Sequence, residues 1–355
     1  MLRKTSGLVH GGNIYDDSGA KRDILDFSAN INPLGMPPAV RQALVSRPQD
    51  AENYPDPLCR SLRRALANHH GLSADWIICG NGAADLIYRL AYAVRPARAL
   101  LPAPTFAEYE HALDAAGCAE TVFFPLQERF NFTPGPEISE AVSPGMNLVF
   151  FCNPNNPTGA AIKKQQVLML ADRCRAAGAI LVVDECFADF MEQEQAYSVC
   201  DALGAYENVA VLRAFTKMYA MAGVRLGYLL TANQDLLQRM AAAGPPWSVS
   251  TVASRCGIAA LSCGAHVART KQLVARNRAL LTGELTRRGC KVYPSLANYL
   301  LFRCEKPGLA DRLEKQGVLV RSCSNYRNLD AFFYRIAVRS ASENRLFLER
   351  LDRIL

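Results

Sequence analysis

The residues of this chain most suited to chemistry follow short, apolar, β-rich runs. Asp184-Glu185 follows the run that ends at Val183, and Thr216-Lys217 comes shortly after the run that ends at Leu212. A carboxylate that leaves a buried strand needs a compensating cation, and a protonated pyridine nitrogen is one such cation. A lysine in an apolar neighbourhood can have its pKa lowered, which makes its amine nucleophilic toward an aldehyde. Lys217 and Asp184 together therefore indicate a lysine amine that forms an imine with an aldehyde and that lies near a carboxylic acid.

Three further loops follow similar runs. The segment Gly80-Asn81-Gly82-Ala83-Ala84-Asp85 opens a helix, where small residues expose N–H groups that can hold a phosphate, although a plain tight turn has the same composition. Phe106 follows two prolines and places an aromatic ring near the same edge. The loop Asn153-Pro154-Asn155-Asn156-Pro157-Thr158-Gly159 contains two X-Pro steps, which fix its backbone, so an asparagine there can donate to a fixed oxygen.

The elements that must position these loops alternate between strand and helix. Apolar runs predict strands at 76–79, 99–101, 121–124, 147–151, 180–183, 209–212 and 226–230, and helical periodicity predicts helices at 83–94, 106–116 and 164–177. This alternation predicts an α/β fold with a mainly parallel sheet covered on both faces. Ligands of such sheets bind at the carboxyl ends of the strands, where the loops above begin.

The pattern changes after residue 246. We expect one long helical stretch over 250–285, strands at 299–302, 318–321 and 332–338, and a final helix from about residue 342. Gly244-Pro245-Pro246 marks the joint. The sequence thus predicts an N-terminal arm over 1–40 that packs on the small domain, a large domain over 41–246, and a small α+β domain over 247–355.

Composition narrows the class of protein. Half of the 355 residues are apolar, 21% are charged, and the net charge of +7 comes from residues spread along the chain. Nucleic acid is therefore not expected as a partner, whereas an anionic substrate is compatible with the excess of positive charge. No apolar stretch is long enough to span a membrane and none follows the N-terminus as a signal would, so a cytoplasmic protein is expected. The twelve cysteines are scattered without C-x-x-C spacing, which predicts reduced thiols and no metal site.

The ordered set of loops resembles the fold-type I pyridoxal-phosphate (PLP) enzymes, the aspartate aminotransferase superfamily, across nearly the whole chain. The Asn-Pro-x-Asn-Pro-Thr-Gly loop, the Asp-Glu strand end, the lysine and Arg225-Leu226-Gly227-Tyr228 fall in family order. The resemblance implies that Lys217 holds PLP as a Schiff base and that Asp184 keeps the ring nitrogen protonated, which makes the ring an electron sink.

The same resemblance implies the other cofactor contacts. Asn156 would bind the ring hydroxyl and Phe106 would stack on the ring. Tyr54 would reach the phosphate in the other subunit of a homodimer. The cofactor phosphate would be held by Gly82, Ala83, Ala84, Thr216 and Arg225.

Two positions depart from the commoner family pattern. Ala214 stands where many relatives have a phosphate-binding serine, which predicts a modestly weaker grip on the phosphate. Phe187 replaces a tyrosine that usually supports the ring hydroxyl, which predicts a shift in the protonation of the imine and not a loss of chemistry.

Within the superfamily the chain is most similar to histidinol-phosphate aminotransferases and to threonine-phosphate decarboxylases of cobalamin synthesis. By that resemblance Arg335 carries the substrate carboxylate and Arg321 contacts a substrate phosphate, two anions that guanidinium groups bind well. His10-Gly11-Gly12-Asn13, the segment from Asp26 to Gly35, and Arg339 resemble the decarboxylases. His10 and Asn32 would help to hold the phosphate.

These features favour a PLP-dependent carboxy-lyase that converts L-threonine O-3-phosphate to (R)-1-amino-2-propanol O-2-phosphate. Two alternatives stay open. One is an aminotransferase acting on histidinol phosphate, since the cofactor machinery is the same. The other is a non-catalytic ligand-binding protein of this fold, against which the intact Lys217, Asp184, Asn156 and Arg335 argue.

Overall fold

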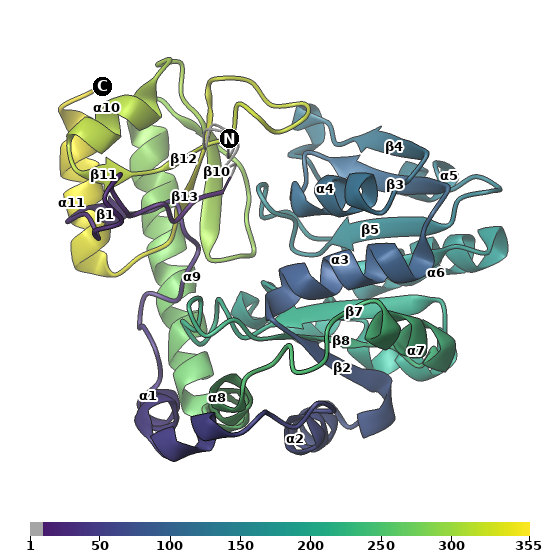
Figure 1. Cartoon of the computed structure of the whole chain (residues 1–355). Coiled ribbons are helices and arrows are strands. Elements are labelled where there is room, and N and C mark those ends of the chain that lie inside the picture. Colours follow the sequence, from purple (N-terminus) through teal and green to yellow (C-terminus); the bar gives the residue numbers. More distant parts are fainter. Residues whose placement is uncertain (1–9) are drawn as a thin grey trace.

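The computed structural model describes residues 10–355, so the first nine residues of the predicted arm lie outside the described residues. Figure 1 shows two groups of elements, one built on a large sheet and one on a small sheet, with the long helix α9 (Gly264–Arg287) beside the small sheet.

The large sheet has seven strands in the order β2-β8-β7-β6-β5-β3-β4. Only β8 runs against its two neighbours, so the mainly parallel sheet that the sequence predicts is confirmed. Most residues of the inner strands are apolar and buried, as expected for a covered parallel sheet, whereas the edge strand β4 is only half-buried. The strands are β2 (Ile77–Gly80), β3 (Arg98–Ala103), β4 (Glu120–Pro125), β5 (Leu148–Cys152), β6 (Ile180–Asp184), β7 (Val209–Ala214) and β8 (Gly227–Leu230).

Helices cover both faces of this sheet. In Figure 1, α3 and α7 lie on the face toward the viewer and α6 lies on the far face. The helices between Pro38 and Ala242 are α1 (Pro38–Val45), α2 (Arg60–His70), α3 (Gly82–Val94), α4 (Glu108–Ala115), α5 (Glu137–Glu140), α6 (Lys164–Ala177) and α7 (Gln234–Ala242).

The second group of elements has a four-stranded sheet in the order β12-β13-β10-β9, in which each pair is antiparallel. Its strands are β9 (Lys291–Val292), β10 (Tyr299–Arg303), β12 (Arg321–Ser322) and β13 (Phe333–Ala337). The helices of this half are α8 (Thr251–Leu261), α9, α10 (Leu309–Lys315) and α11 (Ala341–Asp352).

Two predictions for this half were wrong in detail. The single helix expected over 250–285 is two helices, because the chain leaves helical geometry at Ser262-Cys263 before α9 begins at Gly264. This break lets α8 pack against α1 and α2 while α9 runs toward the small sheet. The strand expected over 318–321 is also two strands, because β11 (Val318–Leu319) pairs with β1 (Leu25–Asp26) and β12 pairs with β13. The domain boundary at residue 247 stays a prediction.

The arm connects the two groups of elements. The amide of Phe27 donates to the Leu319 carbonyl, and the Phe27 carbonyl accepts from the amide of Ala337, so this part of the arm belongs to the small-sheet side. Five residues later the amide of Asn32 donates to the carbonyl of Lys217, which follows β7 of the large sheet.

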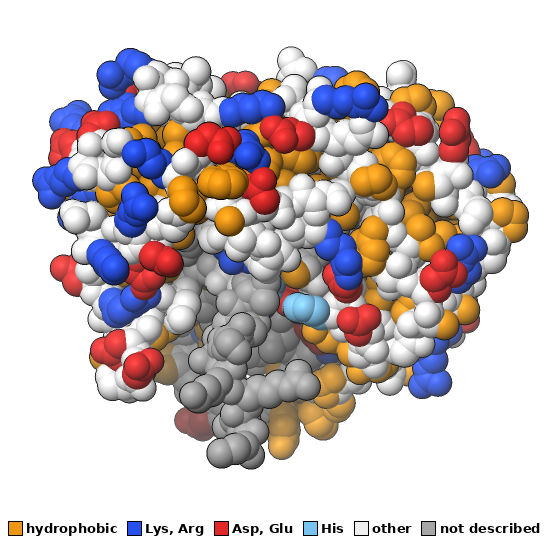
Figure 2. Space-filling view, turned by 90° about the horizontal axis from the view of Figure 1, so that it is seen from above, with side chains coloured by type: hydrophobic (Ala, Val, Ile, Leu, Met, Phe, Trp, Pro, Cys, Tyr) orange, Lys and Arg blue, Asp and Glu red, His pale blue; other side chains and the backbone are white. Residues whose placement is uncertain are grey.

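The surface carries charges of both signs. Figure 2 shows Lys and Arg side chains interspersed with Asp and Glu over the face seen from above. All twelve cysteines are free thiols, and most are buried. Within residues 10–355, no three His, Cys, Asp or Glu side chains come together as a metal-binding group, and no helix is long and apolar enough to cross a membrane.

A buried ionic cluster lies at the carboxyl ends of β6 and β7. The guanidinium of Arg213 on β7 donates to Glu185 at 2.6 Å, to Glu194 at 2.7 Å and to Asp189 at 2.9 Å. Lys271 on α9 contacts the second oxygen of Glu194 at 3.2 Å. We call these five residues the Arg213 cluster. It joins two strands of the large sheet to the long helix.

Replacing Arg213 by leucine should lower the free energy of unfolding by about 3–5 kcal/mol, because up to three carboxylates would lose their main cation in a buried position. Chemical denaturation would measure the change. Arg175→Leu is the matched control, since the Arg175–Asp172 pair is exposed on both sides and should contribute less than about 1 kcal/mol. Similar losses in the two variants would contradict a structural role for the cluster.

Candidate active site

The parallel strands bring the predicted loops to one edge of the large sheet. Asp184 is the last residue of β6, Lys217 follows β7 by three residues, and α3 begins just after β2. Arg225 precedes β8, and since β8 is antiparallel, its start lies at the same edge as the ends of its neighbours. Strand direction therefore explains why residues spread over more than 140 positions meet at one place.

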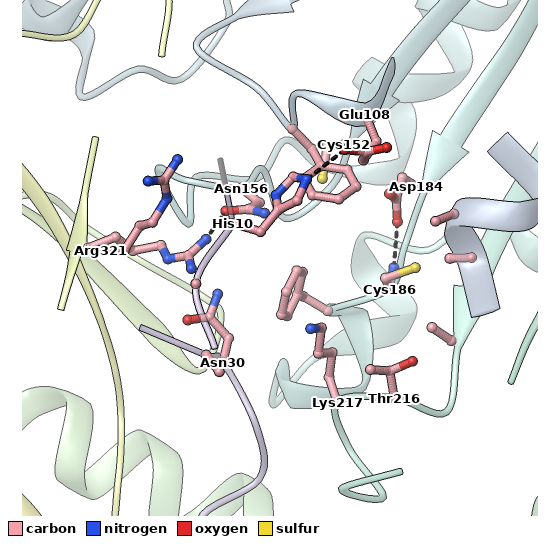
Figure 3. A pocket seen from close by; sticks show the side chains of 18 of the residues that line it. His10, Asn30, Glu108, Cys152, Asn156, Asp184, Cys186, Thr216, Lys217 and Arg321 are labelled. Carbon is pink, nitrogen blue, oxygen red and sulfur yellow. Dashed lines mark hydrogen bonds and ion pairs between the residues drawn. The ribbon is translucent and has the colours of Figure 1, made fainter. Parts of the chain in front are cut away.

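A cavity of about 410 Å³ lies at this edge, between the large sheet, the arm and the small sheet. Figure 3 shows Lys217, Asp184, Asn30, His10 and Arg321 around it. All the predicted site residues line it except Gly82, Tyr54 and Asn32; those that do are His10, Ala83, Ala84, Phe106, Asn156, Asp184, Thr216, Lys217, Arg225, Arg321 and Arg335.

Lys217 presents its amine to the cavity. Burial, and after it the nearby guanidinium of Arg335, lowers the pKa of Lys217 to about 8. The amine lies 5.9 Å from the centre of the Phe187 ring. An amine with this pKa is partly neutral near neutral pH, which is the state that attacks an aldehyde.

Asp184 is enclosed and has two fixed donors. The hydroxyl of Tyr109 donates to Oδ2 at 2.5 Å, and the amide of Cys186 donates to Oδ1 at 2.9 Å. Burial raises the pKa of Asp184, and the bonds from Cys186 and Tyr109 act in the opposite direction. A cation that enters the cavity and meets this carboxylate would favour its ionised form.

Tyr109 was not among the predicted site residues. Its ring stacks on Phe150 with centroids 4.7 Å apart and meets Phe106 edge to face at 5.6 Å. It lies on the first turn of α4, three residues after Phe106, and its place close behind a predicted site aromatic is the signal that could have identified it.

The start of α3 forms a narrow anion cradle. A Cβ added to Gly227 would come within 2.6 Å of the Ala83 nitrogen, and one added to Gly82 would come within 2.7 Å of an Arg225 nitrogen. Gly82 has a φ of +80°, which favours glycine. Backbone N–H groups of a helix start, the Arg225 guanidinium and the Thr216 hydroxyl together suit a phosphate.

A second set of cations lies on the small-sheet side. Arg335 on β13 is buried, donates to the Asn156 side-chain oxygen, and donates to the Ser28 carbonyl at 2.7 Å, while its Nε has no partner. Arg321 on β12 lies 5.4 Å from the Tyr326 ring and donates to Asn325 at 2.7 Å. Both guanidinium groups line the cavity that contains Lys217.

His10 lies at the cavity wall and is held by an acid. Its Nε2 is 2.6 Å from Glu108 Oε1, and its ring is 5.5 Å from that of Phe106. The hydrogen bond to His10 is the first of the contacts that lower the pKa of Glu108 to about 2. The ionised Glu108 thus fixes His10 beside the ring of Phe106.

Asn32 is placed differently from the prediction. Its side chain is buried away from the cavity. The asparagine of the arm that lines the cavity is Asn30, whose Oδ1 has no hydrogen-bond partner. The Ile31 amide donates to the Ala29 carbonyl, and this tight turn directs the two asparagines to different sides. A buried, unpaired amide oxygen at a cavity wall indicates a polar ligand there.

Tyr54 lies outside this cavity. Its side chain is 81% exposed and stacks on Trp247 with ring centroids 4.6 Å apart. Because Tyr54 does not line the cavity of its own chain, its predicted contact with a cofactor phosphate requires the cavity of a second subunit.

The cavity fits pyridoxal phosphate. Lys217 would hold its aldehyde carbon, Asp184 its ring nitrogen and the α3 cradle its phosphate. Phe106 supplies an aromatic face, and Asn156, whose oxygen is used by Arg335, has its amide nitrogen free of any described partner. When bound, the cofactor supplies an electron sink.

In the cofactor-free protein, the Lys217 amine should titrate with a pKa of about 8, whereas an ordinary lysine has a pKa of about 10.4. Its rate of acetylation by acetic anhydride should rise with pH through that midpoint, because only the neutral amine reacts. Peptide mass spectrometry would follow it, with exposed Lys21 as the internal reference. Arg335→Met should raise the Lys217 midpoint, since a nearby cation is lost. A midpoint equal to that of Lys21 would contradict the assigned environment.

Comparison with known proteins gives a consistent result. The family model described as "Aminotransferase class I and II" matches residues 22–351. A threonine-phosphate decarboxylase of Salmonella typhimurium is 40% identical over 98% of this chain and 96% of its own length. A histidinol-phosphate aminotransferase of Symbiobacterium thermophilum is 34% identical over 94% of this chain and 91% of its own.

Solved structures show the same fold. The L-threonine-O-3-phosphate decarboxylase of Porphyromonas gingivalis superposes with a TM-score of 0.83 and 28% identity, and the match covers 92% of this chain and 98% of that one. The fold is that of the fold-type I PLP-dependent enzymes, and pyridoxal phosphate is the cofactor. The extent of the family match and the identity of these relatives show that the chain belongs to the class I and II aminotransferase family.

Proposed function

We propose that this chain is a PLP-dependent decarboxylase of a phosphorylated amino acid. The substrate is L-threonine O-3-phosphate, and the product is (R)-1-amino-2-propanol O-2-phosphate for the side chain of cobalamin. The observation that carries the proposal is the presence of Arg335 and Arg321 in the cavity of Lys217, in addition to Arg225 beside the cofactor cradle. The greater identity to the decarboxylase than to the aminotransferase supports it.

The two arginines suit the two anionic groups of such a substrate. Arg335 is already oriented by its hydrogen bonds to Asn156 and to the Ser28 carbonyl. Its unpaired Nε can therefore donate to a substrate carboxylate without a large rearrangement. Arg321 is less constrained, and together with His10 and Asn30 it can surround a phosphate. In this proposal Asn30 takes the role that the sequence gave to Asn32.

Anchoring both ends of the substrate decides which bond breaks. The bound cofactor would supply the electron sink for the loss of carbon dioxide, while Arg335 and Arg321 would hold the two ends of the substrate and so orient its carboxylate. A phosphate held by Arg321, His10 and Asn30 would limit rotation about the bond between the amino nitrogen and Cα, which sets the direction of the carboxylate. Lys217, with a pKa of about 8, can then return a proton to Cα.

Product analysis tests the proposal. Incubation with threonine phosphate should release one carbon dioxide per substrate without any keto acid, and Lys217→Ala should abolish both this activity and the borohydride-reducible chromophore. Lys21→Ala, a change at an exposed lysine, should leave both intact.

Two outcomes would contradict the assignment. Glutamate formed from histidinol phosphate and 2-oxoglutarate, without carbon dioxide release from threonine phosphate, would make the chain an aminotransferase. Absence of any reducible chromophore in the reconstituted wild type would favour a ligand-binding protein of this fold.

A homodimer with shared sites is part of the proposal. Tyr54 and Trp247 form a stacked, exposed aromatic pair, and Leu58, four residues after Tyr54, is 51% exposed. Large apolar groups gathered on a surface mark an interaction site. The family resemblance implies that Tyr54 reaches the cofactor phosphate of the other subunit. A cytoplasmic location remains an expectation from the sequence.

Sedimentation velocity at micromolar concentration should give twice the chain mass of 38.9 kDa. Trp247→Glu should weaken the dimer by about tenfold or more, as expected for an aromatic anchor at an interface, and should also lower cofactor retention. Met169→Glu, at an exposed apolar side chain of α6, is the control and should change neither. A wild type that sediments as one chain and retains the cofactor would contradict the shared site.

A further inference from the structure

Asn32 is a buried residue whose contacts the proposed function has not used. Its backbone amide donates to the Lys217 carbonyl at 3.1 Å, and its side-chain Nδ2 donates to the Met218 carbonyl at 2.6 Å. Two consecutive carbonyls of the segment that contains the reactive lysine therefore bind one residue of the arm.

Every polar atom of Asn32 has a partner. Oδ1 accepts from the Leu34 amide at 2.9 Å, and the backbone carbonyl accepts from the Gly35 amide at 3.0 Å. The second hydrogen of Nδ2 points to Thr270 Oγ1 on α9 at 2.8 Å, and His266 Nε2 is 3.2 Å away. Because Thr270 donates its own hydroxyl hydrogen to the His266 carbonyl, it acts as an acceptor toward Asn32. Only a side chain with two N–H donors and one acceptor fits this position.

The segment that holds Lys217 depends on such outside support. Residues 215–226 link β7 to β8 without a strand or an α-helix, and Ala220 has a φ of +50°. The backbone hydrogen bonds within this segment range from 3.1 Å, from Val224 to Met221, to 3.4 Å, from Ala220 to Lys217. The hydrogen bond from the Asn32 side chain to the Met218 carbonyl, at 2.6 Å, is shorter than these. The position of the Lys217 backbone, and with it the reach of its amine, is thus set from the arm.

The same stretch of the arm also contacts the substrate side. The Ser28 carbonyl accepts from Arg335, and the Asn30 carbonyl accepts from the Asn298 side chain. A single segment of five residues therefore contacts Arg335 at its start and the lysine segment at its end.

We propose that Asn32 is a positioning residue for Lys217, which fixes the amine relative to the anion site around Arg335. This inference rests on the proposed function of Lys217. Its effect falls on the chemical step, since a displacement of a reacting group by about 1 Å can cost about 10²-fold in rate. Substrate binding, which uses other side chains, should change little.

The test replaces Asn32 by aspartate, which keeps the shape and turns a donor into an acceptor facing the Met218 carbonyl. The holoenzyme variant should retain the borohydride-reducible chromophore, show a kcat lower by about 10²-fold and a KM within a few-fold of wild type, and shift the pH midpoint of its visible absorbance. The matched control is Asn277→Asp, because Asn277 is equally buried and donates its Nδ2 to the Arg339 carbonyl at 2.8 Å. The control should lose comparable thermal stability but keep kcat and the absorbance midpoint.

Equal kcat values and absorbance midpoints in Asn32→Asp and Asn277→Asp would show that Asn32 only stabilises the fold, and would overturn the inference. If Asn32→Asp does not fold, Asn32→Ala replaces it, with the same split between kcat and KM expected and the same result contradicting it. A wild type without a reducible chromophore would reject the proposed function instead, so the two failures are distinguishable.

Discussion

The desolvation of charged groups at one edge of a parallel sheet is the constraint on which the rest of the structure depends. Asp184 lies at the end of a buried strand, and Lys217 faces the same cavity with its pKa lowered by burial. Neither charge can be left without polar neighbours. For Asp184 the chain meets this need with one donor from another element, the Tyr109 hydroxyl on α4, and one local donor, the Cys186 amide. The position of the carboxylate is therefore set before any cofactor binds.

The same constraint shapes the layer behind the site. Glu185 follows Asp184, and while Asp184 faces the cavity, Glu185 binds Arg213 in the Arg213 cluster. Burial raises the pKa of Asp189 in that cluster to about 6, although the Arg213 guanidinium acts in the opposite direction. Because Lys271 of α9 also enters the cluster, the long helix is held to the catalytic strands by charge as well as by apolar packing. Two ionic layers, one facing the cavity and one facing the core, thus meet at Asp184, the last residue of β6, and Glu185, which follows it.

The sequence was sufficient for the order of elements and for residues fixed by their place after a strand. Asp184, Lys217 and Asn156 could be predicted because strand direction alone carries them to one edge. Residues set by irregular backbone could not. Asn30 and Asn32 differ only in which side of a tight turn they occupy. The break between α8 and α9 falls at Ser262-Cys263, where neither a proline nor a cluster of polar residues marks the end of a helix. Arg213 was missed because two of its three ionic partners, Asp189 and Glu194, lie in the irregular stretch between β6 and β7.

The two departures from the family pattern affect different ends of the cofactor. Ala214 lines the cavity without a hydroxyl, so the phosphate cradle depends on Thr216, Arg225 and the start of α3. Phe187 packs edge to face on Tyr299, whose hydroxyl is already used by the Asn155 carbonyl, so neither ring supplies a donor to the cofactor ring. Asn156 is then the remaining amide at that position, and its oxygen is bound by Arg335. A carboxylate bound at the free Nε edge of Arg335 would leave the contact between Arg335 and Asn156 in place, so one guanidinium would link the substrate end of the site to the ring-hydroxyl end.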